Sequence, residues 1–402
     1  MPETFWLQRT SPAFRLMIAT SWLAPACLQE KQEESIREAT RAGLDWTEYL
    51  RLVKRHRTPA LSWAALSRVV GLEIPAPAKQ RLQTHSDACR MLAVKNSMLL
   101  AVVLKCFNRA AIPVMTFKGP TLSSDLYGDV GLRHSRDLDL AVPPADSQRA
   151  KACLENMGWR VEPTWFPLTP SQWESLLRHE HHFSFGHPEG TGLVELHWRN
   201  QWDPPGSDGD YWLRSIPSVW QGCAYQAMNP VDQIVYLCHH GASHVWFRAK
   251  WLGDIARIYA GERVDWEAVL SEARSAGKDR AVLACLRLLE LLYGLPLPNL
   301  PGNPWKALPS RLIDAPLHAL QAPPELEPTV SVASIPRWLR KSLYEMQLLP
   351  QKPWWEPLFR IWYRREDFRV FHLPDRFFWA YAALRPVFWV WRWVRRGLAV
   401  HD

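Results

Sequence analysis

The chain lacks the sequence features of several large protein classes. Its 7 cysteines are scattered and form no Cys-x-x-Cys pair, which argues against a disulfide framework or a zinc ribbon and favours reduced thiols. Residues 1–20 mix charged with apolar side chains and show no compact hydrophobic stretch before a small-residue cleavage site, so a secretory signal is not expected. No fixed-period repeat occurs. Together these absences predict a cytoplasmic protein.

Excess positive charge is scarce outside the C-terminal part of the chain. The sequence has 48 Lys and Arg against 40 Asp and Glu, and residues 337–402 alone hold 13 basic against 6 acidic side chains. A basic surface spread over the whole molecule is therefore not indicated, and nucleic acid is not expected as a partner. With 47% hydrophobic and 22% charged residues, the 402-residue chain is not mostly disordered and predicts two or three folding units.

Five segments differ in pattern and composition. Apolar residues recur at helical spacing in 1–110 and again in 201–295, which predicts an N-terminal and a C-terminal helical region. Between them, 111–200 shows short strand-like patterns separated by a helical one. Residues 296–336 hold 10 of the 33 prolines, which is typical of a linker, and 337–402 holds 8 of the 23 tryptophans in a basic context.

The middle segment predicts a small mixed β-sheet. Apolar runs at 112–117 and 138–142 indicate buried strands, and 145–157 indicates a helix that ends at a glycine. Two further runs, 182–185 and 193–198, are joined by a turn-rich link that suits a hairpin. The expected fold class is therefore α+β, with a small mixed sheet flanked by helical regions.

Three acidic residues in these strands predict a metal site. Asp137 and Asp139 are two residues apart at the start of the second strand, so a side-chain period of two puts both carboxylates on one face. Glu195 lies in the last strand on the face that it shares with His197, opposite the apolar side chains. Like charges held this close repel, and a divalent cation such as Mg²⁺ relieves the repulsion. Acids on adjacent strands are what two-metal phosphoryl or nucleotidyl transfer requires.

A glycine-containing loop before these acids is suited to binding phosphate. Gly119 is followed by Pro120, which favours the first position of a helix, and backbone N–H groups at a helix start bind phosphate. Basic side chains nearby supply the opposite charge. Lys118 also fits a plain strand-end cation, and Arg136 also fits a neutralising partner of the aspartates. The candidate nucleotide-binding residues are Lys118, Gly119, Arg133, Ser135 and Arg136.

These motifs together resemble a known family. The motifs are Lys118-Gly119, a Tyr127-Gly-Asp-x-Gly-x-Arg133 loop, Asp137-x-Asp139, Glu195-Leu-His-Trp198, His240-x-x-x-His244 and Trp251-Leu-Gly-Asp254. With them, about 40–300 of the chain resembles the bacterial uncharacterised nucleotidyltransferase family, a branch of the DNA polymerase β-like nucleotidyltransferase superfamily. The sequence departs from the superfamily at Gly119-Pro120, where Gly-Ser is usual, and in the 18-residue gap from Gly119 to Asp137.

The resemblance implies transfer of a nucleoside monophosphate from an NTP to a hydroxyl or phosphate acceptor, with release of pyrophosphate. It implies that Asp137, Asp139 and Glu195 bind Mg²⁺ or Mn²⁺, and that Glu195, or a water beside it, helps to deprotonate the acceptor. Gly119 would lie near the phosphates, and Arg133 would contact one of them. The acceptor, the base of the nucleotide and the oligomeric state stay open: a saccharide, a lipid or peptide head group, a protein side chain and a small antibiotic-like molecule all fit.

Histidines offer a competing interpretation. A zinc or iron site from two groups of histidines would make the protein a metallohydrolase, but no His-Glu-x-x-His occurs, and packing or substrate contact is favoured. The two groups are His179, His181 and His182, and His239, His240 and His244. The candidate cleft-lining residues are His197, His240, His244 and Asp254, of which Asp254 also fits an ion pair with Arg248 or Lys250. A further alternative is a non-catalytic nucleotide-binding or scaffold protein with the same fold.

The tryptophan-rich stretch 377–394 suggests a surface-binding helix. It is 18 residues long and includes Arg385, Pro386 and Arg392, so it is a poor candidate for a membrane span. Tryptophan with arginine suits a helix lying in a membrane interface, and equally suits docking on the protein's own helical region. Stacking on single-stranded nucleic acid is a less favoured use. The expected location is cytoplasmic, with a possible peripheral contact to the inner membrane face.

Overall fold

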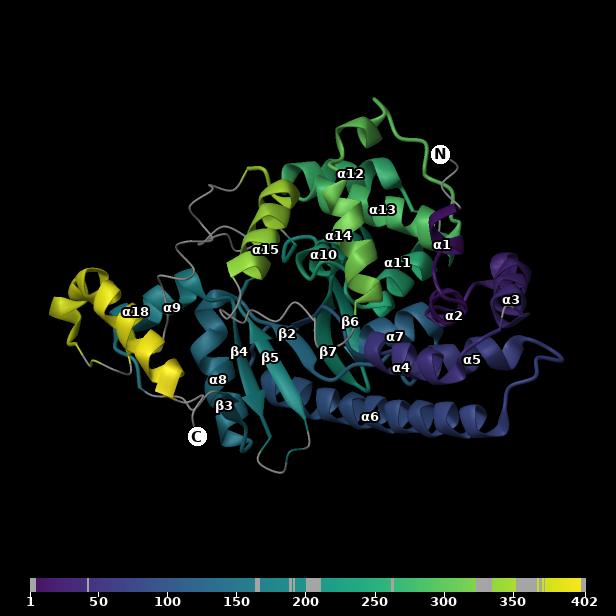
Figure 1. The fold of residues 1–402 in the computed structure, drawn as a ribbon. Coiled ribbons are helices and arrows are strands. Elements are labelled where there is room, and N and C mark those ends of the chain that lie inside the picture. Colours follow the sequence, from purple (N-terminus) through teal and green to yellow (C-terminus); the bar gives the residue numbers. More distant parts are fainter. Residues whose placement is uncertain are drawn as a thin grey trace.

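The protein has a mixed α+β fold built on one seven-stranded sheet, as the sequence predicts (Figure 1). The computed structural model describes residues 5–41, 43–162, 167–187, 190, 192–199, 211–261, 264–322, 335–351, 367–368, 371 and 373–398. The helices are α1 Phe5–Gln8, α2 Pro12–Thr20, α3 Ala26–Arg41, α4 Trp46–His56, α5 Pro59–Arg68, α6 Ala76–Arg109, α7 Pro120–Tyr127, α8 Ser147–Asn156, α9 Pro170–His179, α10 Pro230–Ser243, α11 Ala249–Gly261, α12 Trp266–Ser275, α13 Asp279–Tyr293, α14 Arg311–Gln321, α15 Ile335–Leu348 and α18 Ala380–Leu398.

The sheet has the strand order β3-β4-β5-β2-β1-β7-β6. The strands are β1 Met115–Thr116, β2 Leu138–Ala141, β3 Arg160–Glu162, β4 His182–Gly186, β5 Leu193–His197, β6 Ile216–Trp220 and β7 Cys223–Ala227. β2 runs parallel to β5, and β1 runs parallel to β7, whereas the other neighbours are antiparallel. The two predicted acid-bearing strands, β2 and β5, therefore lie side by side at the centre of the sheet.

One face of the sheet packs on helices. Side chains alternate along a strand, so Leu138 and Leu140 of β2 lie on the face opposite Asp139, and Val194 and Leu196 of β5 lie opposite Glu195. All four apolar side chains are at most 1% exposed. They share one hydrophobic core with apolar side chains of α6, α8 and α9. This core fixes the two strands and leaves their acids on the other face.

The remaining helices form a second core that joins distant parts of the chain. Helices α2 to α5 and α10 to α15 contribute to one apolar cluster, so the N-terminal and C-terminal helical regions pack against each other. Figure 1 shows α10 to α14 above the strands and α6 below them. Tyr236 of α10 contacts Phe117 at the end of β1, with ring centroids 5.0 Å apart. The helical layer therefore reaches the face of the sheet that carries the acids.

The sheet continues beyond residue 200, into the segment for which the sequence predicts helices. β6 and β7 form a hairpin that turns at Gln221-Gly222, where both residues have positive φ, as a tight two-residue turn requires. The edge strand β6 is largely exposed and contains Pro217, so neither a hydrophobic run nor a regular alternation marks it. β3 was also not predicted, and α14, with Pro316 inside it, lies within the proline-rich segment.

Helix α6 is long and apolar enough to cross a membrane, judged by length and composition only. In the fold, 39% of its most apolar window is buried against protein. Leu100, Val103 and Phe107 from this helix belong to the core behind the sheet, and each is at most 1% exposed. Part of the apolar surface of α6 thus packs within the protein, while Met91, Met98 and Val102 on the same helix are 73%, 63% and 54% exposed.

The C-terminal helix α18 packs on the protein through one face. Tyr381 and Phe388 are buried, and Gln172 of α9 donates a hydrogen bond of 2.9 Å to the hydroxyl of Tyr381. On the same helix Val387 is 56% and Val390 51% exposed. Docking on the protein therefore leaves an apolar face of this helix in contact with solvent.

Candidate active site

The carboxylates of Asp139 and Glu195 lie beside each other at the centre of the sheet. In the parallel pairing of β2 with β5, Asp139 is the direct partner of Glu195, so both side chains leave the sheet on the same face. One carboxylate oxygen from each and one ring nitrogen of His197 all lie within 4.8 Å of one another. Asp137 stands two residues before Asp139, at the entrance to β2. The sheet register therefore brings Asp139 and Glu195 together, whereas Asp137 lies outside this group of the described residues.

His197 lies between two of these carboxylates. Its Nε2 atom is 3.7 Å from Asp139 Oδ1 and 3.6 Å from Glu195 Oε2. Burial alone would lower the pKa of His197, but the two carboxylates outweigh it and raise this pKa above the usual 6.5. The sequence analysis proposes that His197 lines the cleft, and in the structure its ring contacts both acids.

Lys118 neutralises Asp139. Its Nζ atom lies 3.1 Å from Asp139 Oδ1, and the two side chains are only 10% and 5% exposed. Although burial opposes ionisation of each group, their mutual attraction raises the pKa of Lys118 and holds the pKa of Asp139 well below its usual range. The ammonium group also lies 5.6 Å from the ring centroid of Tyr236. Lys118 is therefore a component of the site rather than a surface cation.

Asp137 differs from Asp139 in its electrostatic surroundings. Burial and then the charges of Asp139 and Glu195 raise the pKa of Asp137, and Lys118 offsets only part of this effect. Burial would raise the pKa of Glu195, but its contact with His197 at 3.6 Å outweighs burial and lowers this pKa. The site thus combines two carboxylates with lowered pKa values, Asp139 and Glu195, and a third, Asp137, whose pKa is raised by burial and by the other two charges.

The loop before α7 has a backbone conformation that requires glycine. Gly119 has φ +83° and ψ −146°, a region almost closed to other residues, and Pro120 is the first residue of α7 as predicted. A Cβ at Gly119 would lie 3.8 Å from Ser135 Oγ, so the loop runs close to the segment that precedes β2. Ser135 Oγ donates a hydrogen bond of 2.8 Å to the carbonyl of Asp137. The predicted nucleotide-binding residues Gly119 and Ser135 are therefore neighbours of the acids.

Arg133 and Asp254 form a buried ion pair with each other. Arg133 Nε lies 2.9 and 3.0 Å from the two carboxylate oxygens of Asp254 on α11, and the side chains are 2% and 1% exposed. This ion pair assigns both residues to positioning the loop before β2. The sequence had suggested that Arg133 contacts phosphate. It had also suggested that Asp254 pairs with Arg248 or Lys250. Arg136, by contrast, is exposed.

His240 and His244 lie one turn apart on and just after α10 and pack against aromatic rings. Their ring centroids are 4.9 Å apart, and the ring of His244 stacks on that of Trp251 at 5.2 Å. Burial lowers the pKa of both, to about 4 for His244. Within the described part of the chain, the groups with metal-site spacing do not include either residue. The two groups of histidines considered in the sequence analysis thus do not combine into one site.

Two further side chains near the acids emerge from the tertiary structure. Tyr236 touches Phe117 and Lys118, and its burial raises its pKa to about 12. Lys250 is 7% exposed and donates a hydrogen bond of 3.1 Å to the carbonyl of His134. Burial and the charge of Arg133 lower the pKa of Lys250 to about 7. Lys250 sits just before the Trp251-to-Asp254 motif, but nothing in its local sequence signals burial near Asp137.

Comparison with known proteins identifies a family. Residues 42–294 match the family described as uncharacterised nucleotidyltransferase, close to the range of about 40–300 expected from the motifs. No curated protein and no solved structure matches the chain. The matched range covers α4 to α13, and with them every strand of the sheet and all the acids of the site. The chain belongs to the uncharacterised nucleotidyltransferase family.

Proposed function

We propose that this protein transfers a nucleoside monophosphate group from an NTP to a hydroxyl or phosphate acceptor and releases pyrophosphate. Membership of the family supports nucleotidyl transfer in general. The observation that carries the more specific proposal is the direct pairing of Asp139 with Glu195 on adjacent parallel strands, with Asp137 two residues away.

The donor set fits a divalent cation such as Mg²⁺ or Mn²⁺. Asp137, Asp139 and Glu195 would hold it through carboxylate oxygens, the hard ligands that these ions prefer. Repulsion from the other two acids contributes to the raised pKa of Asp137, and added positive charge would relieve it. When bound, one or two such ions supply Lewis-acid stabilisation of the triphosphate and of the leaving pyrophosphate.

The chain's own residues would orient the triphosphate. Gly119 lets the backbone come close at the start of α7, where N–H groups lack helical partners and can meet phosphate oxygens. Lys118 places a buried positive charge beside Asp139, and the exposed Arg136 can add a second one. These residues would bind the triphosphate and orient it before the transfer step.

Glu195 would accept the proton of the acceptor, directly or through a water. Its pKa is lowered by the contact with His197, so the carboxylate is ionised near neutral pH and able to take a proton. His197 lies within 3.7 Å of both Asp139 and Glu195 and would hold Glu195 in position.

Pyrophosphate release tests the proposal. The full-length protein is incubated with each of the four NTPs, Mg²⁺ and cell extract as a source of acceptor. We expect pyrophosphate release with at least one NTP. The rate of release should fall at least about 100-fold in Asp139→Ala. It should be unchanged in Asp87→Asn, a substitution at an exposed position on α6. Full activity of purified Asp139→Ala would contradict the assignment.

The non-catalytic alternative has a separate test. Because Lys118 already neutralises Asp139, the acids can persist in a folded protein that binds nucleotide without turning it over. Isothermal titration with NTP and Mg²⁺, read beside pyrophosphate release, distinguishes the cases. No metal-dependent nucleotide binding would favour a scaffold, binding without pyrophosphate release would favour a non-catalytic nucleotide-binding protein, and binding with release supports the enzyme.

We also propose that the C-terminal segment binds the inner face of a membrane and so holds a cytoplasmic protein at that surface. Trp379, Val387 and Val390 are 69%, 56% and 51% exposed. Residues 337–402 carry most of the net positive charge, which complements anionic lipid.

A further inference from the structure

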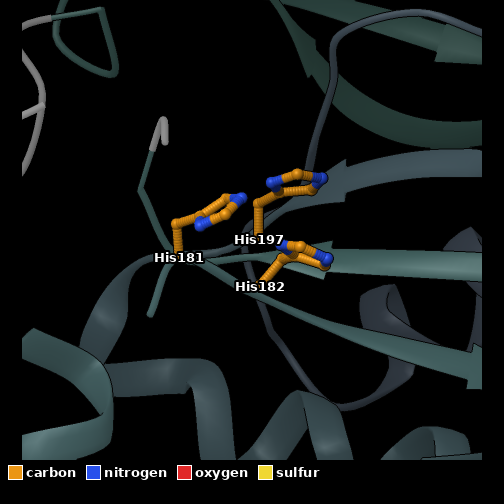
Figure 2. A group of neighbouring side chains, drawn as sticks. All are labelled: His181, His182 and His197. Carbon is orange, nitrogen blue, oxygen red and sulfur yellow. The ribbon is translucent and has the colours of Figure 1, made fainter. Parts of the chain in front are cut away.

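Three histidines gather at the ends of two neighbouring strands. His181 precedes β4, His182 begins β4, and His197 ends β5 (Figure 2). One ring nitrogen from each lies within 4.8 Å of the others. The ring centroids are 4.3 Å apart for His181 and His182 and 5.0 Å apart for His182 and His197. The three imidazoles thus form a compact group at one point of the sheet.

The backbone fixes this group. In the antiparallel pairing of β4 with β5, His182 is the direct partner of His197, so the two side chains leave the sheet on the same face. His181 lies outside β4, where the alternation of faces no longer applies, and its carbonyl accepts a hydrogen bond of 3.1 Å from the amide of Trp198. The strand register therefore fixes His182 beside His197, and the hydrogen bond from Trp198 holds the backbone of His181 next to them.

The chemistry of the group differs from that of the acids. Imidazole nitrogens suit Zn²⁺, Cu²⁺, Ni²⁺ and iron, whereas Mg²⁺ prefers oxygen. Tetrahedral Zn²⁺ with Zn–N bonds of ~2.0 Å needs nitrogens roughly 3.3 Å apart, so the rings of His182 and His197, which are stacked at 27°, must turn toward a shared ion. His181 and His182 are half-buried, which leaves a path for the ion to enter.

We propose that His181, His182 and His197 bind a transition-metal ion of the Zn²⁺ class at a site that shares only His197 with the carboxylate site. Three protein nitrogens leave one coordination position open, as in zinc sites that bind water or a substrate oxygen. An imidazole has two nitrogens, so His197 can face the carboxylates with Nε2 and still contribute to this group. The inference does not rest on nucleotidyl transfer.

Cobalt binding tests the site directly. The full-length protein is stripped with a chelator and titrated with Co²⁺, whose visible d–d absorption strengthens when the ion enters a site with four or five ligands. We expect one equivalent of Co²⁺ that Zn²⁺ displaces, and affinity more than about 10-fold weaker in His181→Ala and in His182→Ala. His182→Asn, which keeps a polar side chain of similar shape at the start of β4, is a second variant in case His182→Ala does not fold.

Two controls separate this site from others. His318→Ala removes an exposed histidine on α14, and Asp137→Asn alters the carboxylate site alone, so both variants should keep the Co²⁺ band. The proposal is overturned if Co²⁺ binding is unchanged in the His181 and His182 variants, or if Asp137→Asn loses it to the same degree. Loss of NTP turnover in Asp137→Asn with the Co²⁺ band intact would show that Co²⁺ binding does not depend on NTP turnover.

Discussion

At the scale of single residues, the site depends on how its charges balance. The closeness of Asp139 and Glu195 could be predicted from the sequence, because the acid-bearing face of a half-buried strand is a local property, whereas a shared metal site with Asp137 stays a prediction. The placement of Lys118 against Asp139, and of His197 between two acids, arises from strand pairing and could not be read from spacing alone.

Removing the ammonium of Lys118 should destabilise the metal-free protein. In Lys118→Met the buried Asp139 loses its partner, and we expect the free energy of unfolding in chelator to fall by about 3 kcal/mol. Mg²⁺ should then stabilise the variant more than the wild type, since the ammonium no longer competes for the carboxylate. Urea unfolding with and without Mg²⁺ measures both effects, with the exposed Lys105→Met as the control. An unchanged free energy of unfolding in Lys118→Met would refute the role of the pair.

Lys250 should make stability depend on pH. Its folded-state pKa of about 7 lies below the ordinary 10.5, so between these values the unfolded chain binds the extra proton and stability rises with pH. Lys250→Met removes the cost of burying the charge, which is fully present below about pH 7. We expect the variant to be stabilised at about pH 6, by an amount that shrinks toward about pH 9, in chemical denaturation. The same difference in unfolding free energy at both pH values would contradict this.

At the scale of elements, the strands near the acids were predictable and the edge of the sheet was not. The apolar runs at 112–117 and 138–142 and the predicted hairpin correspond to β1, β2, β4 and β5, which are buried on at least one face. β6 is mostly exposed and contains a proline, so its pairing with β7 is the main feature that defines it as a strand. Its place in the sheet is a tertiary property.

The start of α7 gives a prediction at this scale. Gly119→Ala places a Cβ at φ +83° and ψ −146°, and we expect a loss of about 3 kcal/mol in unfolding free energy together with weaker NTP binding. Gly128→Ala, at φ +66° and ψ 7° at the other end of α7, is the matched control and should cost about 1 kcal/mol without affecting NTP. Urea unfolding and isothermal titration give the two readouts. Equal effects of the two substitutions on NTP binding would show that the Gly119 loop is not part of the nucleotide-binding site.

At the scale of the whole molecule, helices from both parts of the chain pack into one layer, and α10 of this layer contacts the end of β1. The apolar cluster that joins α2 to α5 with α10 to α15 could not be predicted, since helical periodicity shows that a face is buried but not against which partner. The buried pair of Arg133 with Asp254 ties this helical layer to the loop before β2. The acids therefore depend on packing that spans most of the chain.

The exposed face of α18 gives a prediction for the full-length protein. We expect it to float with vesicles of anionic lipid and to lose most of this binding in Trp379→Ser with Val390→Ser, because both side chains are more than half exposed. Val70→Ser, at an apolar position that is 84% exposed on another part of the surface, is the control. Equal flotation of the wild type, the double variant and Val70→Ser would show that these side chains do not bind the membrane.

Mn²⁺ binding to the full-length protein, followed by the electron paramagnetic resonance signal of the unbound ion, tests the carboxylate site most directly. With a non-hydrolysable NTP analogue present, the wild type should bind Mn²⁺, while Asp139→Asn and Glu195→Gln should each weaken this binding by more than about 10-fold and Asp87→Asn should leave it unchanged. Wild-type affinity for Mn²⁺ in both carboxylate variants would contradict the account.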